Sequence, residues 1–329
     1  MRREFQIIDE VMPDVPEPAD VAQVRARVLG SRQRRPHPRL LVAMAAAVVA
    51  ALLVVVPRLG EGQHITATTD GAVQALETAA QARAARPMED DRGWWTREMV
   101  QIYWGKSDKG DFMVMEQFTD TLWVDPTGRN MEEYGASTVK PADEAAWRLA
   151  GSPKLCPAQG CGQKGVRQPV RDTFQLAKGL DLTLAQVKGL PTEVEALRAA
   201  LLAYYAPYLE IDQDTWLWGA GERLLLDAPT SGGTRAALYR LLAALPGTAL
   251  VEGVEALPGF TDTIALVRGA PVQEQIVIHR RSGDLAAVQD VALDAAVAAE
   301  RMVGVGAPFQ RFFLYGMGMP SDPPPSFEP

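Results

Sequence analysis

The chain is poor in the side chains that enzymes use most often as bases, nucleophiles and metal ligands. It contains 3 histidines and 2 cysteines in 329 residues. His37, His64 and His279 lie far apart in the sequence, and none belongs to an H-E-x-x-H motif. A G-x-S-x-G nucleophile elbow and a Walker A loop are also missing. The sequence therefore predicts no catalytic residues, no metal site and no cofactor, and favours a protein that is not an enzyme.

Carboxylate pairs are the catalytic arrangement that the sequence leaves open. Acidic residues are adjacent at Glu132-Glu133 and Asp143-Glu144, among other places. Neighbours on a strand point to opposite faces of a sheet, so Glu132 and Glu133 do not form a pair by themselves. Two carboxylates from distant positions remain possible. They would make the protein a cell-wall glycan hydrolase, which is the alternative to a binding function.

Basic residues are scarce after residue 56. Residues 57–329 contain 25 Lys and Arg against 35 Asp and Glu, whereas residues 1–39 contain 8 Arg against 6 acids. Binding to a phosphate backbone requires a basic surface. The acidic balance therefore excludes nucleic acid as a partner of the larger part of the chain.

One long apolar run is present, at Leu40–Val56. Its 17 residues include 6 alanines and no polar side chain. As a helix it is about 25 Å long, close to the ~30 Å hydrocarbon core, and the stems of Arg39 and Arg58 can extend it. A buried core helix and a cleaved signal peptide are the alternatives. The 39 preceding residues and the lack of an A-x-A site favour an uncleaved signal anchor.

Arginine on the N-terminal side of this run predicts its orientation. Cytoplasmic flanks of membrane helices are enriched in Lys and Arg. Six arginines precede the run within 15 residues: Arg25, Arg27, Arg32, Arg34, Arg35 and Arg39. We therefore expect a single-pass protein of the cell membrane, embedded in the lipid bilayer, with a cytoplasmic N-terminus and an extracytoplasmic C-terminal domain.

Both cysteines, Cys156 and Cys161, fall in that outer domain, in the segment CPAQGC. Cysteines in an oxidising compartment usually form disulfides. Structural zinc has four ligands, and catalytic redox pairs have C-x-x-C spacing. The C-x4-C spacing without a nearby histidine therefore favours a local structural disulfide.

Hydrophobic patterns predict strands, then helices, then strands. Strands are expected at 94–105, 111–118, 121–125, 248–257, 262–269, 274–281 and 285–293. Helices are expected from residue 69 or 70, at 141–149, after a Thr192/Glu195 capping box, at 215–226 and at 234–245, and Ser282-Gly283-Asp284 is expected to form a hairpin turn. The fold class is therefore α+β, with a curved, largely antiparallel sheet packed on helices and preceded by one transmembrane helix. The predicted segments are a mostly disordered cytoplasmic tail (1–39), the transmembrane helix (40–56), a linker (57–67), the α+β domain (68–319) and a Pro-rich disordered tail (320–329).

Aromatic residues are enriched in the first predicted strands. Trp95, Tyr103, Trp104 and Trp123 are candidates for lining a site that holds an apolar or glycan ligand. The alternative is that they belong to the core between sheet and helices. The sequence leaves both possibilities open.

Several blocks resemble an uncharacterised actinobacterial family of single-pass membrane proteins. They are DVPEPADVAQVRARVL, the Arg-rich entry to the Ala/Val run, LWVDPTGR, LPTEVEALRAALLAYY and TRAALYRLLAALPGTALVEGV. The layout is similar to that of anti-sigma-type regulators, and the resemblance implies a curved antiparallel sheet that wraps helices. It implies a non-enzymatic envelope sensor or binding protein, whose partner is an apolar ligand or another envelope protein.

Overall fold

The computed structural model describes residues 69–86, 94–135, 137–156, 161, 166–167, 170–177, 179–205, 211–256 and 260–318. The predicted tail, transmembrane helix and linker (1–67) and the Pro-rich tail (320–329) lie outside these residues. Within the described ranges, no helix has the length and apolar character needed to cross a membrane. The span at Leu40–Val56 therefore stays a prediction.

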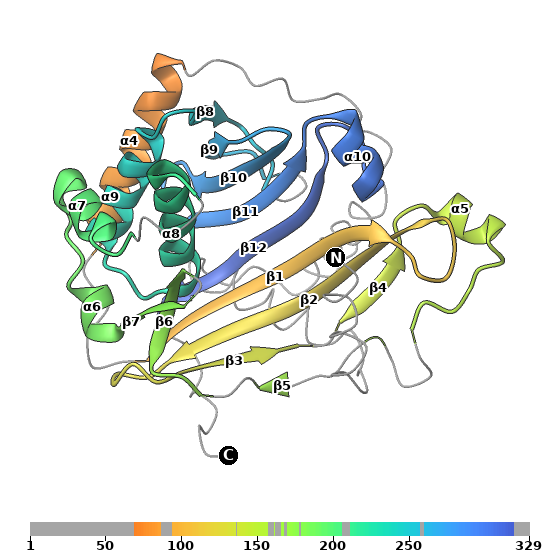
Figure 1. The fold of residues 1–329 in the computed structure, drawn as a ribbon, viewed down its shortest axis with the longest axis horizontal. Coiled ribbons are helices and arrows are strands. Elements are labelled where there is room, and N and C mark those ends of the chain that lie inside the picture. Colours follow the sequence, from red (N-terminus) through yellow and green to blue (C-terminus); the bar gives the residue numbers. More distant parts are fainter. Residues whose placement is uncertain are drawn as a thin grey trace, which may run out of the picture.

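A large antiparallel sheet dominates the described chain (Figure 1). Its strands are β1 (Trp95–Lys106), β2 (Met113–Val124), β3 (Asn130–Tyr134), β4 (Thr138–Pro141), β5 (Val166–Arg167), β8 (Ala249–Glu252), β9 (Thr263–Arg268), β10 (Val272–His279), β11 (Leu285–Ala292) and β12 (Pro308–Gly318). The order is β5-β3-β2-β1-β12-β11-β10-β9-β8, with β4 also paired to β2. A small separate sheet joins β6 (Thr173–Ala177) to β7 (Leu180–Thr183). The predicted α+β class is confirmed.

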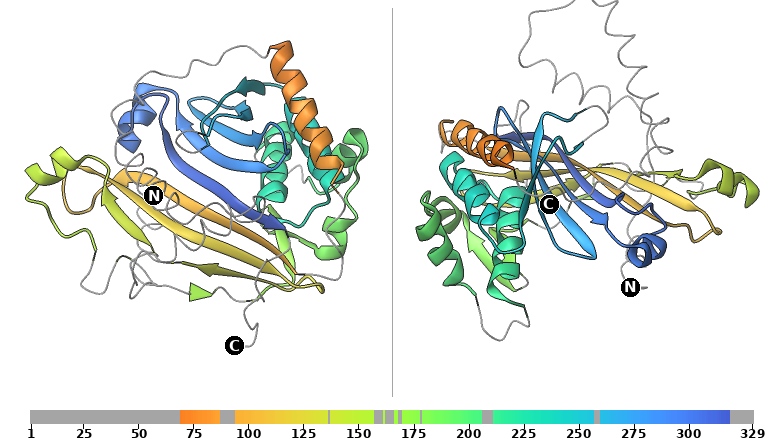
Figure 2. Two further views of the ribbon diagram at one scale, coloured as in Figure 1. Left: turned by 180° about the vertical axis from the view of Figure 1, so that it is seen from behind. Right: turned by 90° about the horizontal axis from the view of Figure 1, so that it is seen from above.

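Helices cover one end of one face of the large sheet (Figures 1 and 2). They are α4 (Asp70–Ala84), α6 (Leu184–Lys188), α7 (Val194–Leu202), α8 (Gln213–Asp227) and α9 (Gly232–Ala243), with α5 (Glu144–Leu149) and α10 (Ala295–Arg301) lying apart from this group. Leu225 of α8, Leu238 of α9 and Ile276 of β10 are fully buried in one core. We call the sheet face that carries Ile276 the helix-side face.

Polar side chains fix where the main helices begin. Thr69 accepts a hydrogen bond from the Ala72 backbone at the start of α4, and Ser231 accepts one from Thr234 at the start of α9. Such caps satisfy backbone N–H groups that have no partner within the helix. The capping box predicted at Thr192 is wrong, because Glu193 is the N-cap of α7 and makes no side-chain cap bond.

The predicted hairpin turn at Ser282-Gly283-Asp284 is confirmed, and its glycine has a packing role. Gly283 has a φ of +69°, which side chains rarely adopt, and a Cβ there would lie 2.0 Å from the Ala79 carbonyl oxygen of α4. The Tyr239 hydroxyl of α9 donates to the Gly283 carbonyl at 2.9 Å. The β10–β11 hairpin is thereby attached to the helices at its tip.

Candidate functional site

The four aromatic residues predicted to line a site lie on both faces of the sheet. Trp95 and Tyr103 of β1 point to the helix-side face, where Trp95 is buried in the core and Tyr103 is half-buried. Trp104 and Trp123 occupy the alternate positions of β1 and β2, which face the other way. The four residues therefore do not line one surface, and Tyr103 alone lies on the open part of the helix-side face.

A row of four aromatic rings crosses this face, beginning at Phe312, which packs against the helix-covered core. Phe312 of β12, Tyr103 of β1, Phe118 of β2 and Tyr134 of β3 follow one another across four neighbouring strands. Successive ring centroids are 6.0, 5.9 and 6.0 Å apart, and all four residues are half-buried. These spacings are typical of interacting aromatic pairs. We call this set the aromatic row.

Hydrogen bonds hold both tyrosines of the row against the sheet. The Tyr103 hydroxyl donates to Oε1 of Gln101 at 2.8 Å, and the Tyr134 hydroxyl donates to Oε2 of Glu132 at 3.0 Å. Each partner lies two residues away on the same strand and therefore on the same face. The rings thus keep a fixed direction along the sheet, and their apolar surfaces remain partly open.

A buried arginine lies beside the row. Arg97 is 1% exposed and is paired with three carboxylates, those of Asp120, Asp227 and Glu132. The Arg97–Asp120 contact is 2.8 Å, and Gln101 donates to the same Asp120 oxygen at 2.7 Å. Burial alone would lower the pKa of Arg97, but the three carboxylates more than offset it and raise that pKa.

Asp120 is the least accessible carboxylate of this group. Burial raises its pKa to about 6, against the opposing effect of the Arg97 charge. Its other oxygen, Oδ1, is buried without a hydrogen-bond partner in the described part of the chain. Because Asp120 is enclosed by Arg97 and Gln101, we interpret this group as a structural anchor of β1 and β2.

Three further carboxylates lie on the same face between α8 and the sheet. Glu222 belongs to α8, Glu274 to β10 and Asp290 to β11, and Glu274 is directly opposite Asp290 in the register. Burial raises the pKa of Glu222 to about 8 and that of Asp290 to about 6, and nearby carboxylates add to both shifts. The pKa of Glu274 is also raised by burial. We call these three residues the carboxylate cluster.

The carboxylate cluster and the aromatic row are continuous. Asp290 is opposite Gln310 of β12, and Gln310 is opposite Tyr103 of β1. With strands about 4.8 Å apart, the Asp290 backbone is about 10 Å from that of Tyr103. Burial raises the pKa of Tyr103, and the charges of Asp120, Glu116 and Asp290 raise it further. The row therefore lies in a field of negative charge.

No group of acidic, cysteine or histidine residues in the described ranges has the geometry of a metal site. His279 is half-buried, with its ring 4.6 Å from that of Phe260, and burial lowers its pKa.

On the opposite sheet face, buried Gln275 and Gln289 form a hydrogen-bonded ladder with Arg311. Gln275 and Gln289 are buried and hydrogen-bonded within this ladder, so we do not assign them to a site.

One catalytic spacing is present in the sequence but not in the fold. Ser137 to Lys140 matches S-x-x-K, in which a serine nucleophile and a lysine come together when the segment is helical. Here Thr138–Pro141 is strand β4, so residues three apart point to opposite faces. Ser137 is buried and donates to Glu116 at 2.7 Å, whereas Lys140 is exposed. The pair therefore does not form a catalytic dyad.

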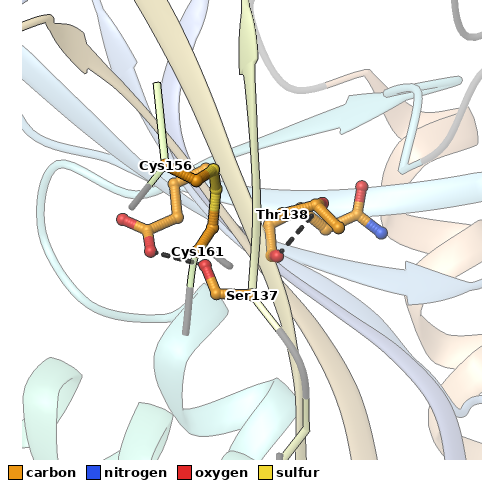
Figure 3. The surroundings of a disulfide bond; sticks show 6 residues. Ser137, Thr138, Cys156 and Cys161 are labelled. Atoms are coloured by element: carbon orange, nitrogen blue, oxygen red, sulfur yellow. Dashed lines mark hydrogen bonds between the residues drawn. A yellow bond between two sulfur atoms is a disulfide. The ribbon is translucent and has the colours of Figure 1, made fainter. Parts of the chain in front are cut away.

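Cys156 and Cys161 lie at disulfide distance, as the sequence predicts (Figure 3). Their Cα atoms are 4.6 Å apart. Ser137 and Thr138, next to and within β4, belong to the surroundings of this pair. The crosslink restrains the segment that follows α5.

No protein-family model, curated protein or solved structure matches the chain. The resemblance to a family of actinobacterial membrane proteins therefore stays a prediction. The function must be inferred from the helix-side face itself.

Proposed function

We propose that the protein is a membrane-anchored binding or sensor protein of the cell envelope, and that its ligand lies along the aromatic row. The anchor would be Leu40–Val56, with the described domain outside the membrane. The observation that carries the proposal is the row itself: four half-buried rings in contact across four strands, of which only Phe312 packs against the helix-covered core. Aromatic surface with a few fixed polar groups is typical of ligand sites.

An apolar or amphiphilic molecule fits this surface better than a folded protein. The row runs across the strands, and its three centroid spacings of about 6 Å make it long and narrow. The tyrosine hydroxyls are already bound to Gln101 and Glu132, so the rings offer mainly apolar surface. Both features favour an extended chain or a flat ring system as the occupant.

Photo-crosslinking from one position of the row tests this proposal. The full-length protein would carry a benzophenone amino acid in place of Phe118, and cells would be irradiated before the adduct is analysed by mass spectrometry. Trp123, on the same strand but on the opposite face, is the matched control position. We expect a small-molecule adduct from position 118 and not from 123. A protein adduct alone, equal adducts at both positions, or no adduct would contradict the proposal.

Glycan hydrolysis is the second candidate, and the carboxylate cluster is the observation that favours it. A carboxyl with a pKa of about 8, such as Glu222, is protonated at neutral pH and can act as a general acid beside Glu274 or Asp290. The test is release of soluble fragments from purified peptidoglycan by the full-length protein. Release that disappears in Glu222→Gln would support hydrolysis, and no release by the wild type would exclude it for this substrate.

A further inference from the structure

The charge beside the aromatic row indicates the chemical class of the ligand. Glu222, Glu274 and Asp290 come from three different elements and lie together at the Phe312 end of the row. Within the described chain, none of the three forms an ion pair with a lysine or arginine, although such pairs are recorded for many other carboxylates. No described ion pair therefore neutralises these three carboxyl groups, and they can interact with a bound group.

Nearby arginines either pair with other groups or offset only part of the negative charge of the carboxylate cluster. Arg97 is paired with Asp120, Asp227 and Glu132. Arg268 is opposite Glu274 and also donates to the Asp214 carbonyl at 2.6 Å; its charge lowers the pKa of Glu274, but burial outweighs this effect. The charge of Arg301 lowers the pKa of Asp290, yet burial and Glu274 keep that pKa raised.

Arg223 also acts on Glu222, and its effect is smaller than the combined effect of burial and the neighbouring acids. At neutral pH Glu222 is therefore mostly protonated, whereas Asp290, with a pKa of about 6, is mostly ionised. A bound cation would favour the ionised form of all three carboxyl groups, because an opposite charge close to a carboxylate lowers its pKa.

Aromatic faces favour the same kind of group. A cation over a Tyr or Phe ring is attracted to the ring face, most strongly where water is excluded. Tyr103 lies in line with Asp290 across the sheet, one strand beyond Gln310, and its ring contacts those of Phe312 and Phe118. An anionic head group would instead meet like charge at this end of the row.

We infer that the ligand is a cationic amphiphile, whose apolar part lies on the aromatic row and whose ammonium group is held by Glu274, Asp290 and Glu222. This inference rests on the proposed function and specifies its ligand. The charged end is fixed by the carboxylates of α8, β10 and β11, and the apolar end extends over Phe118 towards Tyr134. The charge of the cluster favours a cationic head group, and the aromatic row favours an apolar tail on the same ligand.

Three probes that share a decyl chain test the charge preference. Decyltrimethylammonium, decyl maltoside and decyl sulfate would be titrated below their micelle concentrations into the full-length protein held in a non-ionic amphipol. Binding would be measured by calorimetry, with amphipol alone subtracted. We expect the cation to bind at least about tenfold more tightly than the neutral probe, and the anion to bind most weakly.

Variants separate this inference from the proposed function. Glu274→Gln combined with Asp290→Asn should remove the preference for the cation, so that decyltrimethylammonium binds no more tightly than decyl maltoside, and circular dichroism would report whether the fold is intact. Glu195→Gln, at an exposed site on α7, should keep the wild-type preference. Equal affinities of the three probes for the wild type would overturn the cationic ligand alone. Failure of all three probes to bind, or binding that survives Phe118→Ala, would overturn the row as the site.

Discussion

Single residues on the helix-side face show how much charge this fold keeps out of water. Arg97 is almost fully enclosed, and three carboxylates share its charge. A buried ion pair contributes little compared with apolar packing, but removing one member leaves the others uncompensated. The group therefore matters for the stability of β1, β2 and the end of α8, whatever ligand the row binds.

Replacing Arg97 tests how much the stability of the fold depends on its three ion pairs. We expect Arg97→Met to lower the free energy of unfolding by roughly 3–5 kcal/mol, because Asp120 and Asp227 lose their cation in a buried setting. Denaturant unfolding of the full-length protein in amphipol, followed by tryptophan fluorescence, measures the loss. The double variant Arg97→Met with Asp120→Asn should recover part of it. A single variant as stable as the wild type would show that the pairing is unimportant.

Glu222 should make stability fall as pH rises. Its folded pKa of about 8 lies above the ordinary value of 4.5, so folding favours the neutral carboxyl. The stabilisation relative to the ionised form is complete below pH 4.5 and is lost as pH rises through about 8. At about 1.4 kcal/mol per pKa unit, the change is on the order of 5 kcal/mol.

The Glu222→Gln variant isolates this effect from other titrating groups such as Asp290. Because an amide stays neutral, the variant should become more stable than the wild type as pH rises from about 5 to about 9. Unfolding free energies at several pH values measure the difference between the two proteins. Glu195→Gln should run parallel to the wild type. A difference that does not change with pH would contradict the prediction.

At the scale of elements, hydrophobic patterning predicted the strands that belong to regular hairpins. Expected strands at 262–269, 274–281 and 285–293 correspond to β9, β10 and β11, and the helices near 70, 215 and 234 correspond to α4, α8 and α9. Local signals sufficed there, since caps, glycine turns and alternating apolar residues agree with the tertiary fold.

Two strands show where local signals were insufficient. Strand β2 runs without a break through Phe118 to Asp120, although the sequence predicts two strands there. Its first half pairs with β4 and its second half with β3, so tertiary pairing continues the strand across a polar stretch. Strand β12 was not predicted, yet it lies between β1 and β11 and joins both halves of the sheet.

The same limit applies to the candidate site. Composition pointed to Tyr103, but Phe312, Phe118 and Tyr134 come from three other strands, and their contact depends on register. Aromatic enrichment in the segment PFQRFFLYGMG was the available signal for Phe312. The carboxylate cluster combines one helix with two strands, and a single sequence does not reveal such long-range pairing.

The crosslink after α5 should contribute modestly to stability. Closing a loop as short as that between Cys156 and Cys161 is worth about 2 kcal/mol in the chain-entropy model. We expect the double Cys→Ser variant to lose about this amount and to become insensitive to reductant. Alkylation of the denatured wild type taken from cells should label neither cysteine. Labelling of both, or a variant as stable as the wild type, would contradict a structural disulfide.

At the scale of the whole molecule, charge separates two parts of the chain. The arginines before the apolar run belong to a segment with 8 Arg and 6 acids, whereas the larger part carries a net excess of 10 acids. An acidic domain with a row of half-buried rings suits a small cationic ligand. It is poorly suited to a surface of anionic lipid, which attracts basic segments.

Membrane orientation is the prediction that concerns the entire chain. Full-length protein with a tag at each end would be treated with protease in intact cells whose outer layers have been removed. We expect the C-terminal tag to be lost and the N-terminal tag to remain on a short protected fragment, because the arginines at 25–39 keep that end in the cytoplasm. Permeabilised cells, in which both tags are digested, are the control.

Replacing Arg32, Arg34, Arg35 and Arg39 by glutamate should produce a mixed orientation. A protected C-terminal tag in the wild type would contradict the orientation, and a released domain without the N-terminal tag would indicate a cleaved signal peptide.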